Sequence, residues 1–151
     1  MFLSHLFIGC FMIAITVTIH AIATDRLLVL LEKIGPRMFH LFRRGWKIPM
    51  LIVTVLGVFL AHIIQIWIWA ALYFYFEHDV LKNFETALYF STVSFTTVGF
   101  GDIVLSPEWR LLSSFEAANG FILFGWSTAF IFEIISKLYE DDKIKKTGNE
   151  R

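Results

Sequence analysis

Three long apolar runs, separated by polar segments, dominate the pattern of this chain of 151 residues. Residues 3–23 contain no Asp, Glu, Lys or Arg, and residues 48–76 and 111–138 form two further runs. A helix of about 20 apolar residues covers a hydrocarbon core of about 30 Å. The pattern therefore predicts three membrane-spanning helices.

A shorter helix is predicted between the second and third runs, over residues 83–95. Asn83 is a suitable N-cap, and Glu85 lies in the first turn, where a carboxylate suits the positive end of a helix. The segment is too short to cross a bilayer. We expect a re-entrant helix, followed by an irregular segment over residues 96–102.

The composition agrees with a membrane protein, since 57% of the residues are hydrophobic and 17% are aromatic. The fold class predicted is therefore an all-α integral membrane protein. Cys10 is the only cysteine, which excludes an intrachain disulfide and a cysteine-based zinc site.

The first apolar run has an alternative interpretation as a secretory signal peptide, because Ala21-Ile22-Ala23 resembles a small-x-small cleavage site. However, no Lys or Arg precedes this run, and Arg26 follows it closely. This is the reverse of the usual charge order in a signal peptide. We therefore assign residues 1–24 to an N-terminal transmembrane helix.

The net charge of zero hides an uneven distribution of charge. Residues 25–47 carry six basic and two acidic side chains, whereas residues 77–110 carry two basic and five acidic ones. Basic connections stay preferentially on the cytoplasmic side. We expect a multi-pass protein of the cell membrane with an extracytoplasmic N-terminus and a charged cytoplasmic tail over residues 139–151.

The basic segment 25–47 also has apolar residues at helical intervals. We expect an amphipathic helix that lies in the headgroup plane, bends at Gly35-Pro36 and has anionic lipids as partners. A plain solvated linker is the alternative. The apolar positions are Leu27, Leu28, Leu31, Ile34, Met38, Leu41 and Phe42.

Glycines at alternate positions mark the irregular segment. Gly99 and Gly101 can adopt backbone angles that residues with a Cβ atom avoid. Irregular backbone at membrane depth is tolerated only inside protein or beside a wet cavity, because unpaired peptide groups in lipid are costly. If consecutive carbonyls face one axis, their oxygens can replace water around a bare cation.

The run Thr96-Thr97-Val98-Gly99-Phe100-Gly101-Asp102 resembles the selectivity filter of potassium channels, with Phe100 in place of the commoner tyrosine. Phenylalanine at this position recurs in two-pore-domain potassium channels, which the run Ala87-Leu88-Tyr89-Phe90-Ser91-Thr92 also resembles.

The wider resemblance is to two-transmembrane, one-pore potassium channels, with an extra N-terminal transmembrane helix. It implies a pore domain over residues 48–138, with an outer helix 48–76, a pore helix 83–95 and an inner helix 111–138.

The resemblance implies a homotetramer that conducts K⁺ passively and performs no enzymatic reaction. K⁺ ions would be bound by carbonyl oxygens and the Thr97 hydroxyl, with no organic cofactor and no nucleic-acid partner. The filter residues so implied are Thr97, Val98, Gly99, Phe100 and Gly101.

Support for the filter is expected from neighbouring side chains. Phe100 lacks a hydroxyl, so we expect it to pack against Tyr89 and Phe90. Val93 and Phe90 stand where some relatives place a glutamate and a tryptophan, so Asp102 is expected to lack a strong partner. The support residues are Thr96, Asp102, Tyr89, Phe90, Val93 and Glu116.

Carboxylates in membrane helices are costly unless paired or hydrated. Glu116 is expected to brace the pore helix by hydrogen bonding to Ser91 or Ser94, although lining the cavity is an alternative. Glu133 is expected to pair with one of three basic residues, Arg43, Arg44 or Lys47.

His62 and Gln65 share a helix face and are expected to form interhelical hydrogen bonds, with a pH sensor as the alternative. At the outer mouth, acidic residues can either attract cations or form a solvated surface. These residues are Glu77, Asp79, Glu85 and Glu108.

The inner helix resembles that of two-transmembrane potassium channels, with Gly120 at the hinge position of that family. Side chains spaced by four residues are expected to line the pore, although simple packing is the alternative for each phenylalanine. The gate and lining residues are Gly120, Gly125, Phe124, Thr128, Phe132 and Ser136.

Two other functions remain open at this point: a weakly selective monovalent cation channel, and a pore-like subunit of a potassium uptake system. A membrane enzyme is disfavoured, because no catalytic triad, phosphate loop or HExxH motif is present. No arginine-repeat voltage sensor is found either. Control is expected from the filter, the bilayer, the basic linker or a separate regulatory subunit.

Overall fold

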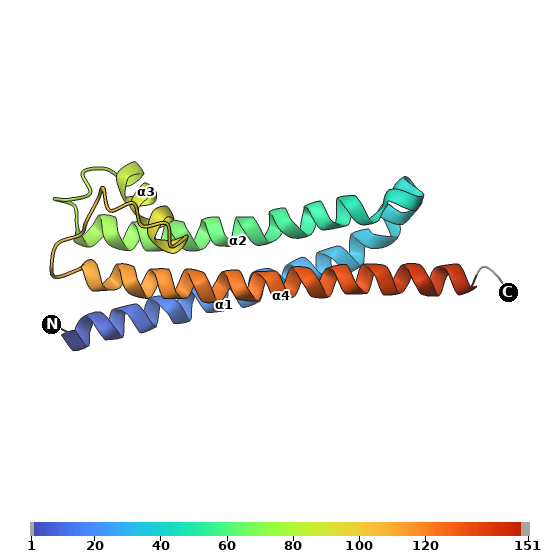
Figure 1. The fold of residues 1–151 in the computed structure, drawn as a ribbon, viewed down its shortest axis with the longest axis horizontal. Helices are drawn as coiled ribbons and strands as arrows, with labels where there is room; N and C mark the ends of the chain where they lie inside the picture. Colours follow the sequence, from blue (N-terminus) through green and yellow to red (C-terminus); the bar gives the residue numbers. More distant parts are fainter. Residues whose placement is uncertain (1, 149–151) are drawn as a thin grey trace. The chain divides into compact units, whose positions relative to one another are not determined.

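The computed structural model describes the backbone of residues 2–148 and the side chains of residues 3–43 and 45–140. Over this range the chain is helical, without strands (Figure 1). Four α-helices and one short 3₁₀ helix follow one another: α1 Phe2–Phe42, η1 Arg43–Gly45, α2 Lys47–Phe76, α3 Phe84–Phe95 and α4 Arg110–Gly148.

Three of these helices are long and apolar enough to cross a membrane. They cover Leu3–Phe42, Lys47–Phe76 and Arg110–Glu140. The number of spans predicted from the sequence is therefore confirmed, and the chain is a multi-pass membrane protein. The second and third spans agree closely with their predicted limits, whereas the first extends well beyond residue 24.

The basic segment after residue 24 differs from the prediction, because it continues α1 instead of forming a separate helix in the headgroup plane. Leu27 and Leu31 are buried together with Ile134 and Leu138 of α4. Ile34 and Met38 pack against the same cluster. These apolar positions, three and four residues apart, form a stripe that packs against neighbouring helices, so the alternative of a plain solvated linker is also wrong.

The chain divides into two compact units. The first unit comprises Met1–Ala21 and Leu60–Phe124, and the second comprises Ile22–Phe59 and Gly125–Arg151. Each unit has a hydrophobic core of its own. The predicted filter belongs entirely to the first unit.

In the first unit, aromatic residues of α2 and α3 and leucines of α4 form much of the core. Trp69, Tyr73 and Phe95 are almost completely buried, as are Leu112 and Leu123 of α4. Figure 1 shows α3 and the segment after it beside the later half of α2. This packing positions the start of the irregular segment directly after a buried aromatic residue.

The N-terminal helix packs closely against α4 within the same unit. A Cβ atom built on Gly9 would lie 2.8 Å from Cγ of Phe115. His5 contacts the ring of Trp109 edge to face, with ring centroids 4.9 Å apart. Glycine at position 9 therefore permits the two helices to approach at the Phe115 ring.

We predict that Gly9→Val destabilises the protein by about 1–3 kcal/mol, because the added side chain overpacks the contact with Phe115. The measurement is the unfolding midpoint of the purified protein in one detergent. Gly45→Val is the control, since a Cβ atom there meets nothing within 4 Å. Equal midpoints for both variants would contradict the proposed close contact.

Candidate functional site

The short helix α3 leads directly into the irregular segment. Asn83 caps its N-terminus by accepting hydrogen bonds from the Thr86 N–H at 2.8 Å and the Thr86 hydroxyl at 2.9 Å. Glu85 lies in the first turn, as predicted. The other end of α3, near Thr96, carries the partial negative charge of the helix dipole, which favours cations.

The backbone alternates in conformation after α3. Thr97, Gly99 and Gly101 have positive φ angles of 60°, 56° and 76°, whereas Val98 and Phe100 do not. In such alternating segments, successive N–H groups face one side. The carbonyl groups are then left on the opposite side, which is the arrangement that a row of cation-binding oxygens requires.

The end of α3 accepts the N–H groups of this segment. Thr97 N–H donates to Ser94 O at 3.0 Å, and the N–H groups of Val98 and Gly99 donate to Val93 O at 3.0 and 3.3 Å. The segment is therefore anchored through its N–H groups, and its carbonyls do not take part in these contacts.

Thr97 is the strained position of this segment, since its Cβ atom is combined with a positive φ of 60°. The left-handed conformation costs an L-residue with a Cβ atom about 1–2 kcal/mol. Gly99 and Gly101 adopt it without that cost. Backbone strain of this kind is concentrated at functional sites.

Phe100 does not pack against Tyr89 and Phe90 within the chain, contrary to the prediction. Its side chain is 70% exposed. Phe90 is buried and contacts Tyr73 of α2 edge to face at 5.2 Å. The register of α3 thus turns Phe90 toward α2, and a cavity of about 190 Å³ remains behind Gly99.

Asp102 has a strong hydrogen-bond partner, which corrects the prediction that it lacks one. The Tyr89 hydroxyl donates to Asp102 Oδ2 at 2.8 Å. This hydrogen bond to a carboxylate raises the pKa of Tyr89 above its usual value. The partner is the tyrosine that the sequence predicted to pack against Phe100.

Glu116 is completely buried behind α3. The Ser91 hydroxyl lies within hydrogen-bond distance of both Glu116 Oε1 and the backbone oxygen of Ile66 on α2. The expected contact between Glu116 and the short helix is therefore present, and it joins α2, α3 and α4. Its importance for conduction remains a prediction.

Gly120 lies where α4 passes the end of α3. A Cβ atom at this position would overlap the backbone carbonyl oxygen of Phe95. The absence of a side chain therefore permits close packing immediately before the irregular segment. Close packing therefore explains a glycine at position 120 independently of a hinge. The hinge itself remains a prediction. At Gly125, by contrast, a Cβ atom would meet nothing within 4 Å.

The candidate lining residues of α4 lie mostly outside its buried stripe. Phe132 is 69% exposed and Thr128 is also exposed, whereas Ser136 is half-buried. Phe124 contacts Phe95 and His62, with ring centroids 5.6 and 4.7 Å apart. The packing interpretation therefore applies to Phe124, and pore lining by the other three remains a prediction.

A buried polar network joins α1 to the rest of the first unit. Gln65 contacts His62 Nδ1 at 3.2 Å and His20 Nδ1 at 3.1 Å, and its amide also reaches the backbone oxygen of Thr16. Asn119 of α4 donates to the Thr16 hydroxyl at 2.8 Å. The interhelical role expected for Gln65 is present, but its partners on α1 were not predicted.

Two further carboxylates have partners other than those expected. Glu133 pairs with Lys137 at 2.8 Å, because residues four apart on a helix are neighbours. Glu77 is buried and accepts hydrogen bonds from the N–H and hydroxyl of Ser106 at 2.9 and 2.7 Å. Glu77 is therefore a structural anchor and not an exposed acid at the mouth.

The chemistry available at this site is coordination by backbone oxygens. Among the described residues, no group of three or more His, Cys, Asp or Glu side chains is placed to hold a metal ion. The oxygen-rich segment from Thr97 to Phe100, close to the negative end of α3, is suited to hard monovalent cations.

Comparison with known families agrees with this chemistry. A family model described as an ion channel matches residues 61–137, just over half of the chain. The chain belongs to this ion-channel family. The match covers the later half of α2, the whole of α3, the irregular segment and most of α4. No curated protein and no solved structure matches the chain.

We predict that Gly120→Ala destabilises the protein by about 3 kcal/mol or more, because the new methyl group overlaps a backbone oxygen that cannot rotate away. The unfolding midpoint is the measurement. Gly125→Ala serves as the comparison, and we expect it to be neutral or slightly stabilising within the helix. A hinge without close packing would give similar stability for both variants.

We also predict that Asp102→Ala lowers the pKa of Tyr89 toward the ordinary value of about 10, since the hydrogen bond that stabilises the protonated hydroxyl is lost. Alkaline titration of phenolate absorbance measures this change. Subtracting the titration of Tyr89→Phe isolates the contribution of Tyr89. An unchanged midpoint in Asp102→Ala would show that the two side chains are not in contact in solution.

Proposed function

We propose that this ion channel is selective for K⁺ and that it works as a homotetramer. The observation that carries the proposal is the alternating backbone after α3, together with the N–H groups of Thr97, Val98 and Gly99 bonded back to that helix. One chain supplies a single row of oxygens. Four copies around an axis supply rings that replace the hydration shell of the ion.

The ion sites in this proposal are formed by carbonyl oxygens and one hydroxyl. The carbonyls of Thr97, Val98, Gly99 and Phe100 form the successive rings, and the Thr97 hydroxyl closes the innermost site. Oxygen ligands suit alkali cations, and the likeness of the segment to TVGYG favours K⁺ over Na⁺. The segment is accessible in the single chain, where Val98 is 53% exposed.

Assembly of four copies also accounts for apolar side chains that a single chain leaves uncovered. Phe100 and Phe132 are 70% and 69% exposed. Phe100 lies beside the cation-binding row, and Phe132 lies on the candidate pore face of α4. In the proposed tetramer, neighbouring copies pack around Phe100, and the four Phe132 side chains converge toward the axis as a dewetted constriction.

The proposed orientation follows from the charge distribution. The basic residues near η1 and the end of α4 are placed on the cytoplasmic side of the cell membrane. The segment after α3 then lies nearer the opposite surface, where Asp102 can attract cations to the mouth of the pore.

A weakly selective cation channel is the second candidate, and one observation favours it. The cavity of about 190 Å³ behind Gly99 and Gly101 leaves the filter with little packing on that side. A filter with loose support can change its ring diameter, which lowers discrimination between K⁺ and Na⁺. Side chains of neighbouring copies that pack into this cavity would supply the missing support and restore selectivity for K⁺.

The test of function is flux from liposomes that contain the purified full-length chain. A K⁺ gradient should drive flux that Ba²⁺ blocks, and the reversal potential in mixed K⁺ and Na⁺ should follow the K⁺ gradient. A reversal potential midway between the two gradients would favour the weakly selective channel. A cross-linked product no larger than a dimer would contradict the tetramer.

We predict that Gly99→Ala reduces K⁺ flux by roughly tenfold or more. The positive φ of 56° at this position costs a residue with a Cβ atom about 1–2 kcal/mol in every copy. Gly45→Ala is the matched control, because it also replaces a glycine but lies outside the filter. Full flux from Gly99→Ala, at equal protein content, would contradict the role of this backbone conformation.

A further inference from the structure

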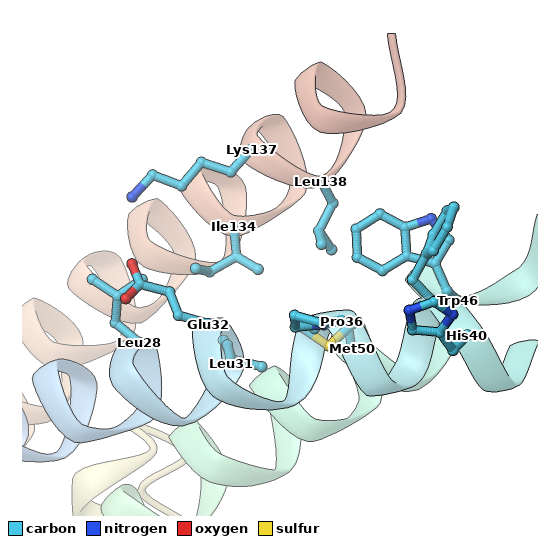
Figure 2. Close-up of a pocket in the computed structure, with 12 residues that line it drawn as sticks. Leu28, Leu31, Glu32, Pro36, His40, Trp46, Met50, Ile134, Lys137 and Leu138 are labelled. Carbon is cyan, nitrogen blue, oxygen red and sulfur yellow. The ribbon is translucent and has the colours of Figure 1, made fainter. Parts of the chain in front are cut away.

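The second unit contains a cavity of about 610 Å³ that is open on one side. Its walls come from the later part of α1, the start of α2 and the end of α4, with Trp46 at the turn between α1 and α2. Figure 2 shows Leu31, Pro36 and Met50 facing Ile134 and Leu138 across this space. A volume of this size is typical of sites that hold an organic ligand.

The cavity exists because two residues with small side chains interrupt the apolar stripe of α1. Gly35 contributes no side chain, and Pro36 contributes only its ring to the wall. A Cβ atom built on Gly35 would come within 3.8 Å only of the Met50 methyl group, which is an ordinary contact. The space in front of Gly35 is therefore open and accepts additional atoms without strain.

The lining of this space is mainly apolar and belongs to helices that are candidates to cross the membrane. Leu31, Met50 and Leu138 are nearly completely buried, and Ile134 is 4% exposed. Water gains few hydrogen bonds against such walls. In a bilayer, the chemistry that matches them is a hydrocarbon chain.

The charged side chains of the lining limit what kind of hydrocarbon ligand fits. Among the lining residues that the structure describes, Lys137 is the only Lys or Arg, and it already pairs with Glu133 at 2.8 Å. Glu32 adds a second carboxylate at the same end of the cavity, whereas Trp46 and His40 lie at the other end (Figure 2). A ligand with its own carboxylate at this end would face the Glu32 carboxylate, and the ammonium group of Lys137 is already paired.

We propose that this cavity binds one acyl chain of a bilayer phospholipid, whose head group stays outside the cavity. The apolar walls hold the chain, and the ion pair at the rim remains intact. A free fatty acid is disfavoured by the Glu32 carboxylate and by the pairing of Lys137 with Glu133. The inference concerns the second unit alone and does not depend on which ion the channel selects.

The experiment uses the full-length chain in phosphatidylcholine vesicles that contain a small fraction of phosphatidylcholine with a diazirine near the end of one acyl chain. After illumination, mass spectrometry locates the labelled residues. We expect label on the cavity residues Leu31, Met50 and Ile134. Ile52 of α2, which is 53% exposed, serves as the reference for ordinary lipid contact.

Two variants fill the cavity from different positions on α1. Gly35→Leu places a side chain in the open space, and Leu28→Trp enlarges a lining residue farther from Pro36. Gly45→Leu is the matched control, since it adds the same side chain at a glycine outside the lining. Each filling variant that retains the unfolding midpoint of the control should reduce cavity labelling at least about fivefold relative to Ile52.

Three results would overturn the proposal. The first is label on Ile52 without label on the cavity residues. The second is cavity labelling that persists in a folded filling variant. The third is a diazirine-bearing fatty acid that labels the cavity residues and displaces the phospholipid probe, which would assign the site to a free amphiphile.

Discussion

Peptide N–H groups inside a membrane need acceptors, and the conformation of the proposed filter, residues 96–102, depends on where those acceptors lie. Thr97, Val98 and Gly99 direct their N–H groups to the last carbonyls of α3. The carbonyl oxygens are then left on the opposite side of the backbone. α3 in turn is held by Ser91 beneath it and by α4, which approaches Phe95 at Gly120. The segment that we propose as the filter is therefore shaped by hydrogen bonds and close packing on the side away from its carbonyl oxygens.

The N-terminal helix, which the family match does not include, is part of the same packing system. Its polar positions Thr16, His20 and Thr24 recur every fourth residue and are buried. Thr16 and His20 contact Gln65, and Thr16 also contacts Asn119. Polar contacts between membrane helices contribute about 1 kcal/mol each, so their main effect is to fix the register of α1 against α2 and α4.

The sequence predicted those features that depend on local pattern. The spans follow from apolar runs, the start of α3 follows from Asn83, and the positive φ angle of Gly99 follows from its lack of a side chain. Contacts between segments far apart in the sequence could not be predicted in the same way. Tyr89 donates a hydrogen bond to Asp102, and Ser106 donates one to Glu77. Both contacts depend on how distant parts of the chain fold back together, and the spacing of residues in the sequence does not predict them. The continuation of α1 to Phe42 was missed because charged residues suggested a boundary, whereas buried leucines decided the packing.

Both oxygens of the Glu77 carboxylate accept hydrogen bonds from Ser106, which ties the chain just beyond the proposed filter to the residue that follows α2. The near end is fixed at Val93. The number of residues between these two attachment points is consequently a structural parameter in its own right. Exposed side chains along this stretch that have no role in its backbone conformation or hydrogen bonds, such as Val104, are open to exchange, but an inserted or deleted residue shifts the oxygen row relative to its neighbours. Tolerance to substitution at such exposed positions and intolerance to length change should therefore occur together in this short part of the chain.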